Sequence, residues 1–133
     1  MPHDIDEEDY SALAGFRFEL RRFLRFSEQA ARSAGLTPQQ HQALLAVRAA
    51  GDTGMLVGDL AEQLLLKPHS TSELIQRLVD HNLAAREQAE DDRRQVRIVL
   101  TDCARDILAG LSTSHRAELR RLRPLLQRLL SAL

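Results

Sequence analysis

Residues 68–77 hold a series of polar side chains that could hydrogen-bond to the edges of DNA bases. Apolar residues recur through this stretch with helical spacing, so the polar ones share the opposite face of a single helix. Serine hydroxyls suit several base edges, glutamine favours adenine, and arginine favours guanine or a phosphate. The residues on this face are His69, Ser70, Ser72, Glu73, Gln76 and Arg77. Taken alone, a polar helix face that only meets water would look the same.

A charged stretch at 90–95 lies between two segments in which apolar and polar residues alternate, as they do in β-strands. Arg93 and Arg94 could reach the DNA backbone or a minor groove, where arginine responds to groove shape and local potential. Asp92 cannot attract DNA by its charge, but its carboxylate could hold an arginine in place through a bidentate pair. On its own, this run would be an ordinary charged surface.

The elements around these residues occur in the order of a winged helix-turn-helix, whose second helix can enter the major groove. The Lys67-Pro68 step separates its two helices, because the residue before proline disfavours helical geometry. The inward positions of the second helix are Thr71, Leu74, Ile75 and Leu78. We expect a small strand at 55–57, helices at 59–65 and 68–81, and strands at 84–89 and 96–100.

Helices are also expected on both sides of this centre, at 8–33, 38–51 and from 102 onward. Gly35 is a natural stop for the first, and Thr37 with Gln40 forms a capping box for the second. Thr101 is the expected N-cap of the last region, which Pro124 should kink or divide. Asn82 suits the left-handed position at which the helix at 68–81 must end.

The apolar stripes of the first and last helical regions exceed what one small domain covers easily. A homodimer in which both ends of each chain intertwine would bury them. The expected contact residues are Leu13, Phe16, Leu20, Leu119, Leu122, Leu126 and Leu129. The alternative is that both stripes pack on the chain's own core.

The net charge of −1 conceals a segregation: residues 1–9 carry five acids and no Lys or Arg, whereas residues 10–35 and 101–133 each sum to +3. A lone cysteine, Cys103, forms no intrachain disulfide, and the histidines are not spaced as zinc ligands. No phosphate-binding loop or nucleophile motif is present, so we expect no enzyme, metal or cofactor. No apolar run reaches the ~18 residues of a membrane span, and no signal peptide is evident. A cytoplasmic protein is expected.

The sequence resembles the MarR family of bacterial regulators over nearly its whole length. Each fragment is weak alone, but their order and spacing make the resemblance specific. The fragments are Leu36-Thr37-Pro38-Gln39-Gln40, Leu60-Ala61, Ser72-x-Leu74-Ile75-x-Arg77-Leu78-Val79-Asp80, and Asp92-Arg93-Arg94 followed by Leu100-Thr101.

The resemblance implies a triangular homodimer that binds a palindromic operator, with half-sites about one helical turn apart. It also implies repression that is relieved by an oxidant or by a small, often aromatic, acid bound between the DNA-binding lobe and the dimer helices. The DNA contacts it implies are Pro68, His69, Ser70, Thr71, Ser72, Gln76 and Arg77, with Asp92, Arg93 and Arg94 at the wing.

Three residues depart from the family pattern. Glu73 replaces a non-acidic residue, and an acid facing phosphate should weaken binding unless it reads cytosine. Asn82 and Cys103 replace common glycines. The start of the first helix lacks the cysteine of the peroxide-sensing branch, which argues against that mechanism.

The expected fold is mainly α with a small antiparallel β-wing. An N-terminal dimerisation helix (1–35) and C-terminal dimerisation helices (102–133) flank a winged helix-turn-helix lobe (36–101). The expected function is sequence-specific regulation of transcription by a DNA-binding homodimer. The alternative is a dimeric winged-helix module that binds another protein and has weak or no specificity for DNA.

Overall fold

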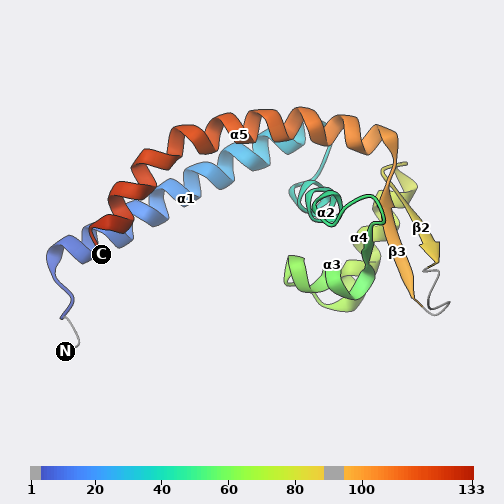
Figure 1. The fold of residues 1–133 in the computed structure, drawn as a ribbon, viewed down its shortest axis with the longest axis horizontal. Helices are drawn as coiled ribbons and strands as arrows, with labels where there is room; N and C mark the ends of the chain where they lie inside the picture. Colours follow the sequence, from blue (N-terminus) through green and yellow to red (C-terminus); the bar gives the residue numbers. More distant parts are fainter. Residues whose placement is uncertain (1–3, 89–94) are drawn as a thin grey trace.

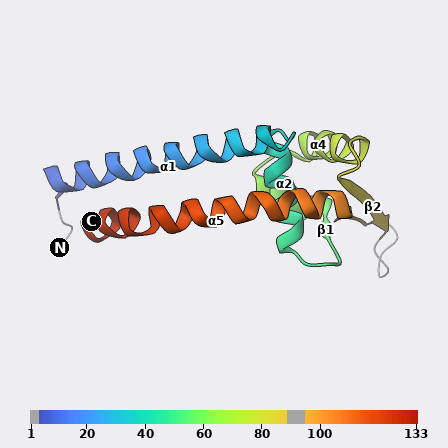
Figure 2. The same ribbon diagram turned by 90° about the horizontal axis from the view of Figure 1, so that it is seen from above.

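Five helices and three strands make up residues 4–88 and 95–133, the part of the chain that the computed structural model describes. The lobe contains α2, α3, α4 and the sheet, while α1 and α5 run side by side away from it as an arm (Figures 1 and 2). The fold is mainly α with a small antiparallel sheet, as expected. In chain order the elements are α1 (Glu7–Ser33), α2 (Pro38–Ala49), β1 (Met55–Leu56), α3 (Val57–Leu64), α4 (Pro68–Asp80), β2 (Ala84–Gln88), β3 (Val96–Leu100) and α5 (Asp102–Ser131).

Local signals fix the helix ends. The backbone N–H of Gln40 donates to Thr37 Oγ1 (3.1 Å), and that of Thr37 donates to Gln40 Oε1 (2.9 Å), which confirms the capping box of α2. Gly35 and Asn82 have φ angles of 82° and 57°, the left-handed conformation expected after a helix. A second capping box joins Asp6 and Asp9 at the start of α1; the sequence analysis did not anticipate it.

The sheet has the order β1-β3-β2, and both pairs of strands are antiparallel. Ile98 in the central strand pairs with Met55 on one side and Arg86 on the other, and its side chain is fully buried. It packs into a core with Leu44 from α2 and Leu60 from α3. This core holds the lobe together and carries α4 on it.

The C-terminal region is one helix rather than several. Pro124 lies inside α5, which continues to Ser131 and curves along the arm (Figure 1). Proline removes one backbone donor and crowds the preceding turn, so a break was one of the two expectations. A division at this proline is wrong, because α5 is continuous from Asp102 to Ser131.

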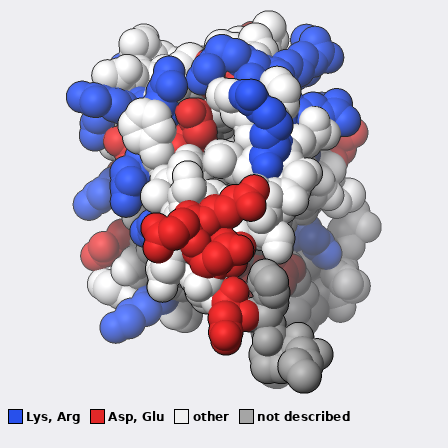
Figure 3. Space-filling model, turned by 90° about the vertical axis from the view of Figure 1, so that its left-hand side faces the viewer, with Lys and Arg blue, Asp and Glu red and all other residues white. Residues whose placement is uncertain are grey.

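The arm buries only part of its apolar surface. Leu122, expected at a dimer contact, is 2% exposed within one chain, so that assignment is corrected to a core position of the arm. Leu13, Leu20 and Leu119 remain exposed, whereas Phe16, Leu126 and Leu129 are half-buried. Acidic side chains gather at the far tip of the arm, with Lys and Arg mostly around them (Figure 3). In the described residues, no helix is both long and apolar enough to cross a bilayer.

Candidate nucleic-acid interface

The turn before α4 orients this helix on the lobe. Leu65 ends α3 in a left-handed conformation (φ 54°), and Lys67 is the extended N-cap before Pro68, which occupies the first turn. The backbone N–H and the hydroxyl of Thr71 both donate to the carbonyl of Lys67, each at 3.0 Å. These contacts hold the start of α4 in place.

The polar face of α4 is open to solvent. Its exposed residues are Pro68, His69, Ser70, Ser72, Glu73, Gln76 and Arg77. Thr71 is the exception, because it is 0% exposed and its hydroxyl is bonded to Lys67. Its place among the implied DNA contacts is therefore corrected: Thr71 belongs to the inward stripe that the helical spacing also assigned to it.

His69 is paired with the unexpected acid of this face. Its Nε2 lies 3.1 Å from Glu73 Oε1, one helical turn away, and both side chains are exposed. A protonated His69 would offset the charge of Glu73 locally. The pairing directs the Glu73 carboxylate toward His69, along the face of α4.

Gln76 is held by hydrogen bonds on both sides of its amide. Its Nε2 donates to Asp80 Oδ1 at 2.8 Å, and Arg86 Nη2 donates to its Oε1 at 2.9 Å. Each amide atom keeps capacity for one further bond, so a fixed Gln76 could still pair with adenine through both atoms.

Sequence reasoning missed Arg86, which β2 brings to the recognition helix. The signal that could have found it is the alternation of the strand, because Arg86 shares a face with buried Ala84. The wing residues that the sequence did predict, Asp92, Arg93 and Arg94, lie outside the described residues. The strands on either side of them pair as far as Gln88 and Val96.

Thr101 ties the end of α4 to the start of α5. Its hydroxyl donates to the carbonyl of Asn82 (2.8 Å) and accepts from the backbone N–H of Ala104 (3.1 Å), which confirms it as the N-cap. The segment that follows α4 is therefore joined to the first turn of α5 by this side chain, and the backbone N–H of Thr101 also donates to the carbonyl of Leu83 (3.2 Å). A movement of the arm relative to the lobe would act on this contact.

Two histidines lie where α1, α2 and α5 meet. The rings of His41 and His115 are 4.8 Å apart, and Phe26 lies edge-on to His115 at 5.3 Å. His115 Nδ1 lies 2.7 Å from the carbonyl of Leu111, which can only accept, so Nδ1 carries a proton. Its Nε2 is 2.8 Å from Ser27 Oγ. Burial, and secondly the charge of His115, lower the pKa of His41 below its usual value.

This lowered pKa predicts that acid destabilises the fold through His41. Below about pH 6.5, His41 takes up a proton in the unfolded chain more readily than in the folded one. The free energy of unfolding should therefore decrease as the pH is lowered. Above that range both states are neutral at His41, and no penalty applies. Denaturant unfolding between about pH 7.5 and about pH 6 should show a shallower fall for His41→Gln than for the wild type. The exposed His81→Gln is the control; equal slopes for all three proteins would contradict the prediction.

A model of the MarR family matches residues 34–95. Among solved structures, the chain is similar to a MarR family protein from Bacillus stearothermophilus (TM-score 0.76, 22% identity, 96% of this chain and 99% of that chain). It is also similar to AbsC, a MarR family transcriptional regulator from Streptomyces coelicolor (0.74, 22%, 98% and 99%). A third similar structure is MepR of S. aureus in complex with DNA (0.68, 20%, 93% and 98%). No curated protein matches the sequence.

These findings cover different parts of the molecule. The family model spans the lobe from α2 to β2, including the whole of α4. The solved structures extend the likeness in fold to the arm, because they cover nearly all of both chains. The lobe is therefore similar to the MarR family model, and the fold of the whole chain is similar to that of the MarR family structures named above.

Proposed function

We propose that the protein is a transcriptional regulator that binds a palindromic operator as a homodimer and represses the genes beside it. The observation that carries this proposal is the exposed polar face of α4, on which Gln76 is fixed by Asp80 and Arg86. A side chain that is already held in one orientation loses little conformational freedom when it binds a base. The MepR structure in complex with DNA supports the same role for this fold.

The proposed DNA contacts are His69, Ser70, Ser72, Gln76 and Arg77 on α4, with Pro68 placing its first turn. Arg86, from β2, is not among these contacts but positions Gln76 through its hydrogen bond to Oε1. Asp92, Arg93 and Arg94 stay in the proposal on the strength of the sequence alone. Because acids balance the basic residues between 66 and 100, specificity should depend on a few placed side chains more than on a strong general field.

The first test is selection of binding sites from random DNA with the full chain. We expect a palindrome, because a two-fold dimer presents two copies of α4 to the duplex. Arg77→Ala should weaken specific binding by about 1–3 kcal/mol if Arg77 reads guanine, or lower the salt slope by about 1 if it binds phosphate. Arg17→Ala, on α1 of the arm, removes the same charge far from α4 and should change neither. No enrichment of any sequence would contradict the proposal and favour the protein-binding module.

A second test concerns the positioning of Gln76. Arg86→Ala removes the donor to Gln76 Oε1 and should relax the base preference at the position that Gln76 reads, by about 1 kcal/mol. Gln76→Ala should relax the same position, and the double variant should lose no more than Gln76→Ala alone. Arg97→Ala, on the neighbouring strand, is the control. Additive losses at different positions would show that Arg86 acts separately.

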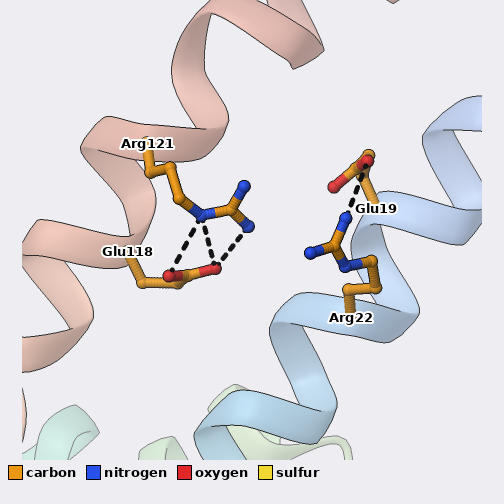
Figure 4. A network of polar contacts seen from close by, with 4 residues as sticks. All are labelled: Glu19, Arg22, Glu118 and Arg121. Carbon is orange, nitrogen blue, oxygen red and sulfur yellow. Dashed lines mark hydrogen bonds and ion pairs between the residues drawn. The ribbon is translucent and has the colours of Figure 1, made fainter.

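We further propose that an aromatic carboxylate relieves repression from a cavity of about 360 Å³ between α1 and α5. Arg22, Arg25 and Phe26 line it, and Phe26 also contacts His115. Figure 4 shows Arg22 and Arg121 in this region, each beside its own glutamate: Glu19 at 3.7 Å and Glu118 at 2.6 Å. Arg25 makes no ion pair within the described residues, so its charge is free for a ligand.

Benzoate, the simplest aromatic carboxylate, should dissociate the operator complex in a gel-shift titration. Arg25→Gln should need several-fold more benzoate, because the arginine–carboxylate pair is lost. Arg17→Gln removes another arginine of α1 that does not line the cavity and should respond like the wild type. A complex that millimolar benzoate leaves intact would contradict this effector while leaving the DNA-binding proposal in place.

A further inference from the structure

We propose that Glu73 determines part of the operator sequence by accepting a hydrogen bond from the amino group of a cytosine in each half-site. The inference rests on the DNA-binding function proposed above and adds the base that this acid selects. Glu73 is an exposed carboxylate on the polar face of α4, among hydroxyl, amide and guanidinium groups. Those groups are proposed DNA contacts, and the position of Glu73 gives it the same access to a base.

Glu73 lies between two proposed DNA contacts on one face of α4. His69 is one turn before it and Gln76 is one turn after it, so the three side chains follow one another along the helix. The side chain of Glu73 is 59% exposed and that of His69 is 86% exposed. Because an α-helix rises about 1.5 Å per residue, Glu73 and Gln76 are about 4.5 Å apart along its axis, near the roughly 3.4 Å step between base pairs. We therefore expect them to reach neighbouring base pairs.

The Glu73 carboxylate is held in place and can still accept another hydrogen bond. Its Oε1 lies 3.1 Å from His69 Nε2, and because a carboxylate oxygen can only accept, Nε2 is the donor. The carboxylate makes no ion pair with any other described residue. An ionised carboxylate has roughly four acceptor positions, so the contact with His69 leaves several for a donor on DNA.

Cytosine is the base whose major-groove edge suits a carboxylate. It presents the N4 amino group, a donor, whereas guanine presents only acceptors and thymine presents an acceptor and a methyl group. Adenine also has an amino group, but its N7 acceptor lies beside it and would face the carboxylate. The amide of Gln76 offers both a donor and an acceptor and matches the adenine pattern instead. Glu73 and Gln76 should therefore select different bases.

The negative charge of Glu73 makes this selection stricter. A carboxylate near the phosphates weakens binding to every sequence, and an acceptor on a base edge would repel it further. Cytosine offsets these costs with a charge-assisted hydrogen bond, which is stronger than one between neutral groups. Because acids balance the basic residues between 66 and 100, no strong general attraction hides the penalty at a site without cytosine.

The experiment measures the base preference at every operator position for variants of the full chain. Selection from random DNA gives the wild-type operator, and gel-shift titrations then use this operator and versions in which each base pair is replaced in turn. The variants are Glu73→Gln and Glu73→Ala. The matched control is Glu28→Ala, which removes the same charge from an exposed position on α1.

At one position in each half-site, next to the position that Gln76→Ala relaxes, the wild type should bind cytosine at least about fivefold more tightly than any other base. Glu73→Gln should favour adenine there, because an amide offers both a donor and an acceptor. Glu73→Ala should show no preference at that position, while its binding to unrelated DNA becomes stronger because a repulsive charge is gone. Glu28→Ala should match the wild type. A purely structural role of Glu73 would not exchange one base for another.

The outcomes separate this inference from the proposed function. An operator without a fixed cytosine beside the Gln76 position, or unchanged base preferences in both Glu73 variants, would overturn the inference while specific DNA binding stands. If Glu73→Ala bound every sequence more tightly by the same factor, Glu73 would only repel phosphate, and the inference would also be overturned. A wild-type chain that enriches no sequence would overturn the proposed function and the inference together. Circular dichroism checks that every variant keeps its helix content.

Discussion

The burial of one stripe of α4 determines what the rest of the lobe can present. Leu74, Ile75 and Leu78 are almost completely buried, and each such side chain contributes ~1.5–3 kcal/mol through its removal from water. A hydrogen bond on the opposite face contributes only ~0.5–1.5 kcal/mol. The core therefore sets the rotation of the helix about its axis, and Gln76 and Arg77 face outward as a consequence.

The arm differs from the lobe, because a single chain leaves part of its apolar surface exposed. Leu122 is covered by its own chain, but Leu13, Leu20 and Leu119 are not. Within the described residues, Arg116, Arg120 and Arg123 of α5 make no ion pair. A second copy would cover the exposed leucines, and this links the proposed dimer to the spacing of the two α4 helices on DNA.

Thr101 and the histidine pair are two of the contacts between the lobe and the arm. Thr101 joins the carbonyl after α4 to the first turn of α5, and His41 of the lobe contacts His115 of the arm. An effector bound between α1 and α5 would lie next to Phe26, which contacts the same histidine. A displacement there has a short physical route to the recognition helix.

The sequence by itself determined the elements and their order, because caps, proline steps and apolar periodicity act over a few residues. Thr37, Asn82 and Thr101 all behave as their local chemistry predicts. Only the tertiary structure decided which side chains remain exposed and able to bind DNA or a ligand, because exposure depends on neighbours distant in sequence. It buried Leu122, carried α5 through Pro124, and brought Arg86 to Gln76. Packing, which no local pattern specifies, made those decisions.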